Sequence, residues 1–157
     1  MFHQPTHFIK ETYRTFLYCG VMAGMTEVLW VYIYTTSNMA DFSQVGIEIT
    51  KSILGNNTIN LFLSAIIGLF IHIFLSVSIA FFYGYLVFYL RKAKILNKFL
   101  LSYICSTIML ICIWWLAYFI ILPIINQDFI LLVPANSAIY SKLLFGITMA
   151  TFYLKVK

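Results

Sequence analysis

Long apolar stretches alternate with short polar segments along this chain. Four of the stretches are about as long as the roughly 20 residues that an α-helix needs to cross a bilayer, or longer. They cover approximately residues 15–36, 60–90, 99–125 and 135–154. Because only helices and closed barrels satisfy their backbone groups in lipid, the pattern predicts an all-α polytopic membrane protein. We expect a bundle of four transmembrane helices that forms a single membrane domain over residues 1–157.

The segment over approximately residues 39–54 has a different, amphipathic pattern. Its apolar residues recur at helical spacing: Phe42, Val45, Ile49 and Ile53. Its polar residues fall mostly on the other side: Ser43, Gln44, Glu48, Lys51 and Ser52. Asn38 and Asp41 resemble a capping box, and Gly55 is typical of a helix end. We expect a helix on the outer membrane surface, serving either as a connector or as a lid over the bundle.

Prolines mark the ends of the remaining segments. Residues 1–14 are predicted to be a flexible polar lead-in, since Pro5 disfavours a regular helix there. The third stretch is predicted to end at Pro123. An apolar link then leads to Pro134, which starts the last helix.

The composition excludes a soluble domain of this size. Of the 157 residues, 62% are hydrophobic and only 10% are charged, and a soluble fold of this length cannot bury so much apolar surface. Cys19, Cys105 and Cys112 all lie in apolar stretches, so we interpret them as small hydrophobic residues.

The positive charges responsible for the net charge of +5 lie in the polar segments that flank the helices rather than in one surface patch. Basic residues precede the first helix, fill the link between the second and third, and end the chain: Lys10, Arg14, Arg91, Lys92, Lys94, Lys98, Lys155 and Lys157. The other two links are weakly acidic. This positive-inside pattern predicts that both termini lie in the cytoplasm. It also makes the lipid bilayer, and not nucleic acid, the expected partner.

Small residues recur at every fourth position of the second stretch. This small-residue stripe consists of Ser64, Gly68, His72, Ser76, Ala80 and Gly84. Small residues at this spacing let membrane helices approach closely. Gly20 and Gly24 on the first stretch, and Gly146 and Ala150 on the last, offer matching faces. We expect all of these residues to pack helix against helix.

Three ionisable residues lie inside the stretches: Glu27, His72 and Lys142. Topology places Glu27 and Lys142 at similar depth, some 10–14 Å from the outer ends of their helices at about 1.5 Å per residue. An unpaired charge at this depth costs several kcal/mol, so we expect Glu27 to pair with Lys142 and His72 to bond to either. This polar cluster either fixes helix register or forms a proton-accepting or anion-coordinating site.

Enzymatic and cofactor chemistry have little support in the sequence. The chain has no hydrolase, metalloprotease or phosphate-loop motif, and Glu27 is the only carboxylate in the stretches. A haem held by two histidines would need a buried partner for His72, whereas His3 and His7 lie outside the stretches. We therefore predict no catalytic residues, no metal and no cofactor.

The second and last stretches share a weak repeat. Residues 72–83 align with residues 142–153, so that His72 falls on Lys142 and Tyr83 on Tyr153. Either a two-plus-two duplication or the shared packing rules of membrane helices would produce it.

Three segments carry a resemblance to a known family: Gly20-x-x-Ala23-Gly24-x-x-Glu27, His72-Ile-Phe-Leu-Ser76-Val-Ser-Ile-Ala80 and Lys142-Leu-Leu-Phe-Gly146. In these the chain resembles the YagU-like group of small bacterial inner-membrane proteins of unknown function. The resemblance implies a bacterial cytoplasmic membrane and a loose link to acid or envelope stress, and it carries over no catalytic residues. The chain departs from the family pattern at Lys142, where a histidine is expected.

These observations lead to one functional expectation and two alternatives. We expect a non-enzymatic accessory or stress-related component of the inner membrane, acting with other membrane-protein subunits or with itself. The first alternative is a small transporter or proton-conducting element that uses Glu27, His72 and Lys142. The second is a redox subunit that binds a cofactor.

Overall fold

The chain folds into helices only, as far as the structure describes it. The structure is a computed structural model that describes residues 6–55, 60–92 and 97–155. Side chains are described for residues 13–55, 60–90 and 97–155. The long helices are α1 (Thr6–Ser37), α3 (Leu61–Lys92), α4 (Lys98–Leu116) and α7 (Ala135–Lys155). Shorter elements are α2 (Phe42–Leu54), the π-helical turn η1 (Ala117–Ile121), α5 (Leu122–Ile125) and α6 (Gln127–Leu132). The predicted all-α fold class is confirmed.

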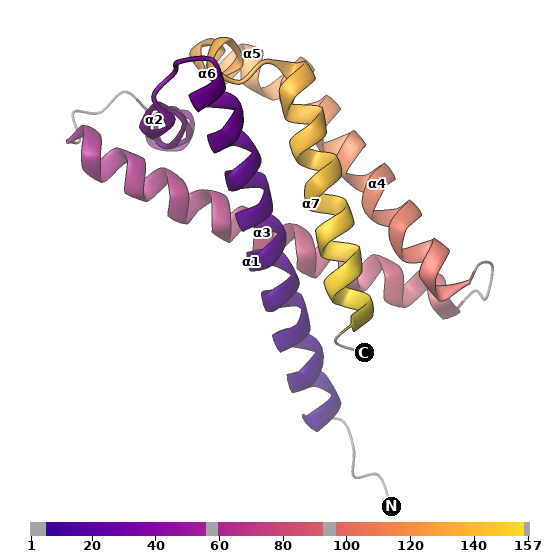
Figure 1. Cartoon of the computed structure of the whole chain (residues 1–157). Coiled ribbons are helices and arrows are strands. Elements are labelled where there is room, and N and C mark those ends of the chain that lie inside the picture. The colour runs from indigo at the N-terminus through magenta and orange to yellow at the C-terminus, as the bar shows by residue number, and fades with distance from the viewer. Residues whose placement is uncertain (1–5, 56–59, 93–96, 156–157) are drawn as a thin grey trace, which may run out of the picture.

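Four segments are long and apolar enough to cross a membrane, so the chain is an integral membrane protein. They are Tyr13–Ser37, Leu61–Leu90, Lys98–Ile125 and Ala135–Lys155. The second has 30 residues, which corresponds to about 45 Å of helix against a hydrocarbon core of about 30 Å. Figure 1 shows that α3 crosses α1 obliquely, whereas α4 and α7 run side by side. A tilted helix can be longer than the bilayer is thick.

The first and third spans differ from the sequence expectation at their ends. The helix of the first span begins at Thr6, so most of the expected lead-in is helical; Pro5 precedes the helix and therefore does not interrupt it. Residue 3 and the side chain of residue 7 lie outside the described part. Pro123 does not end the third span, which continues to Ile125. In the π-helical turn before Pro123, the Leu122 N–H donates to the carbonyl of Ala117, five residues earlier, and not to the carbonyl four residues earlier. Because the regular α-helical hydrogen bonds are already interrupted there, the missing N–H of the proline is tolerated.

The amphipathic helix α2 begins later than expected, at Phe42. The Ser43 N–H donates to the Asp41 side chain at 2.9 Å, so Asp41 is the N-cap and Asn38 forms no capping box with it. This backbone hydrogen bond lowers the pKa of Asp41 below its usual value. Gly55 ends the helix with a φ of 76°, a conformation that favours glycine. The apolar link before α7 contains the short helix α6.

The division of α2 into an apolar and a polar side was wrong at two positions. Glu48, expected on the polar side, is buried, whereas Ile53 is exposed. The carboxylate has two partners: the Lys51 ammonium group of the same helix donates to it at 2.5 Å, and the amide of the distant Asn126 donates to it at 3.1 Å. The same amide lies 2.9 Å from the Ser52 Oγ. Because the carboxylate has partners, it can lie against the bundle.

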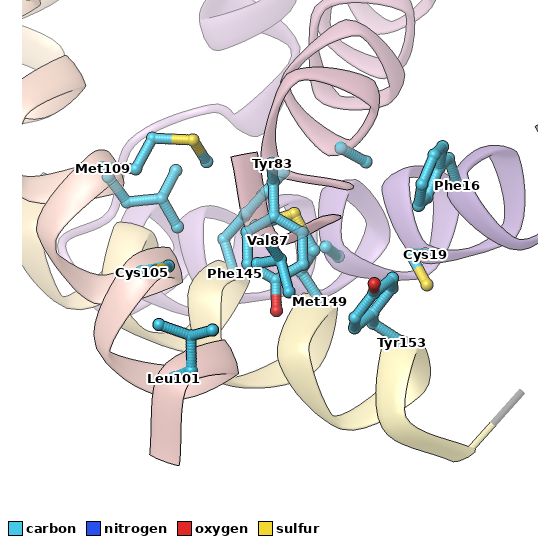
Figure 2. Packing of buried hydrophobic residues seen from close by; sticks show 13 residues of the cluster. Phe16, Cys19, Tyr83, Val87, Leu101, Cys105, Met109, Phe145, Met149 and Tyr153 are labelled. Carbon is cyan, nitrogen blue, oxygen red and sulfur yellow. The ribbon is translucent and has the colours of Figure 1, made fainter. Parts of the chain in front are cut away.

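The main core lies in the half of the bundle nearer the chain termini, here called the terminal half. Figure 2 shows this core, which α1, α3, α4 and α7 all supply. The rings of Tyr83 and Tyr153 meet edge to face with centroids 5.4 Å apart, and both side chains are fully buried. The Tyr83 hydroxyl donates to the Ser102 carbonyl at 3.1 Å, so its polar atom is satisfied inside the core. The terminal half is therefore closed by apolar side chains.

Candidate functional site

The small-residue stripe of α3 lies against two different helices. At its start, Gly68 touches Gly46 of α2 so closely that an added side-chain carbon would lie 1.9 Å from the Gly46 carbonyl oxygen. The Thr50 hydroxyl of α2 donates to the Ser64 carbonyl at 2.6 Å. These contacts hold α2 directly on α3, which gives α2 a fixed place in the bundle and not only a place on a membrane surface.

Further along, the stripe meets α1. A side-chain carbon added at Gly20 would lie 2.5 Å from the Val77 Cα, and one added at Gly24 would lie 2.7 Å from the Ser76 Oγ. Ala80 is fully buried in the same contact. At Gly84 the space is filled by the Phe16 ring. The expected pairing of small residues on α1 and α3 therefore brings two backbones together beside Glu27 and His72.

The small residues of α7 face α4. A carbon added at Gly146 would lie 2.9 Å from the Leu110 Cδ1 and 3.6 Å from the Ser106 Oγ. Ala150 is fully buried. Helix α1 thus packs between α3 and α7, and α7 packs in turn on α4.

The structure brings the three ionisable residues of the spans together around one carboxylate. Only 6% of Glu27 is exposed. Its Oε1 accepts a hydrogen bond from the Lys142 ammonium group of α7. The Ser141 hydroxyl lies 3.3 Å from the same oxygen and 2.7 Å from the Ala138 carbonyl. The predicted pair of Glu27 and Lys142 is therefore present as a buried ion pair.

The imidazole of His72 approaches the other carboxylate oxygen without bonding to it. Its Nε2 lies 3.9 Å from the Glu27 Oε2, too far for a direct hydrogen bond. The same Nε2 lies 3.4 Å from the Gly24 carbonyl oxygen. His72 of α3 and Lys142 of α7, which occupy equivalent positions in the weak repeat, thus approach the two oxygens of the same glutamate from two different helices.

Aromatic residues fix the start of α7 relative to its neighbours. The Trp30 indole of α1 donates to the Ser137 carbonyl at 3.1 Å, and the Trp114 indole of α4 donates to the Ala135 carbonyl at 3.1 Å. The Tyr118 hydroxyl donates to the Val133 carbonyl at 3.0 Å. Since Trp30 lies one turn from Glu27 and Ser137 just over one turn from Lys142, these bonds also set the register of the ion pair.

A half-open cavity of about 300 Å³ has Glu27 and His72 of this cluster among its lining residues. Its walls are apolar and come from α1, α2, α3 and one residue of α6: Val28, Val31, Phe42, Val45, Gly46, Ile49, Phe62, Ala65, Ile66, Leu69 and Phe129. Its polar residues are Glu27, His72 and Ser43. Its volume lies at the lower end of the range of small-molecule sites, about 300–1,000 Å³, and such sites are usually apolar with a few polar groups.

Sequence reasoning missed three parts of this site: Ser141, the cavity and the Asn126 contacts. Ser141 could have been found, because Ser137, Ser141 and Phe145 recur every four residues on one face of α7. The cavity and the Asn126 contacts depend on how α2 packs, which no local pattern shows. Within the described ranges, no three histidine, cysteine or acidic residues are grouped so that they could hold a metal ion.

Comparisons with protein-family models, with curated proteins and with solved structures find no match for this chain.

Proposed function

We propose that the chain is a non-enzymatic component of a bacterial inner membrane that binds a small, largely apolar ligand in the cavity beside Glu27. The observation that carries this proposal is that Glu27, which is ion-paired with Lys142, and His72 both line that cavity. An ion pair that only fixes helix register needs no adjoining space, and membrane helices ordinarily close around it. Here the buried glutamate instead lines an apolar cavity.

The proposed orientation has both termini in the cytoplasm. Arg14, Lys98 and Lys155 lie near the ends of their helices at the terminal half of the bundle. Asp41 and Asp128 lie at the opposite end, beside α2 and α6. The asymmetry of basic residues supports the positive-inside arrangement, with the cavity in the outer half of the membrane.

Purification in mild detergent from the native host tests the binding proposal. Mass spectrometry should identify a small molecule that copurifies in a fixed ratio with the wild-type protein. The Val28→Phe variant, which fills the cavity, should lose it. Leu29→Phe is the matched control, since Leu29 is the adjacent residue, is exposed and does not line the cavity. Equal retention by both variants would show that the cavity is not the binding site.

A second candidate function is transport, because access to the cluster is one-sided. The cavity reaches Glu27 and His72 from the α2 half, whereas the core with Tyr83 and Tyr153 closes the terminal half. One-sided access to a central site is one of the two states that alternating access requires. Proton flux into liposomes containing the wild-type protein, abolished by Glu27→Gln, would favour this candidate over simple binding.

A further inference from the structure

The two carboxylate oxygens of Glu27 lie in different surroundings. Oε1 accepts from Lys142 and lies beside Ser141. Oε2 has no hydrogen bond within the described residues, and its nearest polar neighbour is His72 Nε2 at 3.9 Å. Both side chains line the cavity. A carboxylate oxygen in apolar surroundings is costly without a donor. This oxygen therefore lacks a donor, and it belongs to a residue that lines a space able to hold one.

The gap between the two atoms has the size of a bridging oxygen. An oxygen atom placed about 2.8 Å from each would form ordinary hydrogen bonds with both, at roughly a right angle. The bridging group must donate to the carboxylate. It must also accept from the imidazole, because the Gly24 carbonyl beside Nε2 is itself only an acceptor and favours a hydrogen on that nitrogen. The single Nε2 hydrogen is then shared between that carbonyl, 3.4 Å away, and the bridging group. A hydroxyl group does both, whereas an ammonium group cannot accept and a carboxylate cannot donate.

The charge of the cluster also favours a neutral group. Glu27 and Lys142 cancel each other as an ion pair. A ligand carrying a charge would leave that charge uncompensated in the membrane interior, or would require a second cation next to Lys142. A neutral hydroxyl changes nothing in this balance, and the apolar walls accept the rest of the molecule.

We infer that the cavity binds a neutral amphiphile through a terminal hydroxyl group held between the Glu27 Oε2 and the His72 Nε2, with its alkyl part against the apolar walls. This inference rests on the proposed function, namely that the cavity is a ligand site, and it names the chemical class of that ligand.

Photolabelling of the full chain in detergent micelles tests the inference. The probe is a ten-carbon primary alcohol that carries a diazirine in its alkyl chain, and the labelled peptides are mapped by mass spectrometry. Unlabelled 1-decanol, decane, decanoate and decylamine are each titrated as competitors over the same range of mole fractions in the micelle. We expect labelling of the cavity segments of α1, α2 and α3. We also expect 1-decanol to compete at about tenfold lower mole fraction than the other three, as one or two added hydrogen bonds predict.

Two substitutions of His72 separate hydrogen bonding from space filling. His72→Leu removes the donor and should abolish the preference for 1-decanol over decane. His72→Gln keeps an N–H donor and should retain the preference. Neither change touches the pair of Glu27 and Lys142, so both variants should remain folded.

The failure of this inference differs from the failure of the proposed function. No labelling of the cavity segments, or labelling that Val28→Phe leaves unchanged, would overturn both. Labelling of the cavity with equal competition by 1-decanol and decane would overturn only the hydroxyl assignment. Stronger competition by decanoate or decylamine would overturn it as well.

Discussion

The ion pair between Glu27 and Lys142 gives a prediction whose size can be worked out from the structure. Glu27→Gln removes the only carboxylate near Lys142 within the described residues and leaves that ammonium group about 10 Å from the start of α7. Lys142→Met leaves the carboxylate with Ser141 and His72 as remaining neighbours. Breaking a buried pair by removing one partner costs about 3–5 kcal/mol in proteins. The side chain of Lys142 is 19% exposed, and Glu27 keeps other polar neighbours, so we expect about 2–4 kcal/mol for each single variant.

The double variant should be more stable than the sum of the single effects predicts. Removing both charges also removes the cost of keeping them out of water, so we expect a coupling free energy of about 1–3 kcal/mol. The assay is a double-mutant cycle of unfolding free energies, measured by titration with a denaturing detergent in mixed micelles.

The control cycle combines Glu27→Gln with Lys155→Met. Lys155 is exposed at the far end of the same helix, α7, so this pair should be additive within about 0.5 kcal/mol. Additivity in the Glu27 and Lys142 cycle as well would refute the assignment of a buried ion pair. Glu27 and Lys142 would then not lie at the same depth, and the register of α1 against α7 would differ from the one described.

Three further predictions concern packing, topology and the attachment of α2. Gly68→Leu should lower the unfolding free energy by at least about 2 kcal/mol, because the added side chain has no room beside Gly46. Phe74→Leu is the control: this residue is 71% exposed, so the change should alter the unfolding free energy by less than about 1 kcal/mol. Similar thermal stabilities of the two variants would contradict the packing of α2 on α3. A reporter active only outside the cytoplasm should be silent when fused after Lys157 and active when inserted at Gly55, and the reverse result would invert the orientation. Asn126→Leu should raise the rate of backbone hydrogen exchange in α2 by about tenfold, because Glu48 and Ser52 lose the amide of Asn126 as a partner. The control variant Gln127→Leu, at the exposed adjacent residue, should leave this rate unchanged. Equal exchange rates in both variants would show that Asn126 does not hold α2 in place.

The sequence was sufficient for the features that depend on local pattern or on the cost of burial. Long apolar runs predict the spans, and the expense of a charge in lipid predicts that Glu27 and Lys142 meet. Spacing by four predicts the face on which Gly20 and Gly24 lie. In each case the physical rule acts on residues close in sequence or leaves a charged group only one suitable partner.

The sequence was insufficient where a distant segment decides the outcome. Glu48 is polar and belongs on a solvent-exposed face by its own pattern, but the distant Asn126, together with Lys51, bonds to its carboxylate and lets it lie inside. Pro123 ends helices in general, but the preceding π-helical turn makes it tolerable here. The N-cap of α2 was misplaced by three residues because Asn38 and Asp41 are both good caps, and only the path of the chain chooses between them.

The oblique path of α3 explains why a cavity lies beside the polar cluster. Helix α3 touches α1 closely where Ser76 and Ala80 meet Gly24 and Gly20, and it then diverges from α1 towards its own start, as Figure 1 shows. Helix α2 lies in the resulting wedge and touches α3 at Gly68. The cavity occupies the space left between the two close contacts.

Glu27 and His72 lie about one turn beyond the contact of Gly24 with Ser76, so they stand where the wedge begins to open. The small residues therefore have two effects on the site. They bring α1 and α3 close enough for His72 to approach Glu27, and they fix the point from which the helices separate. On this reasoning, a bulky residue at Gly24 would force the helices apart, carry His72 away from Glu27 and remove the hydroxyl site without altering any residue that lines it.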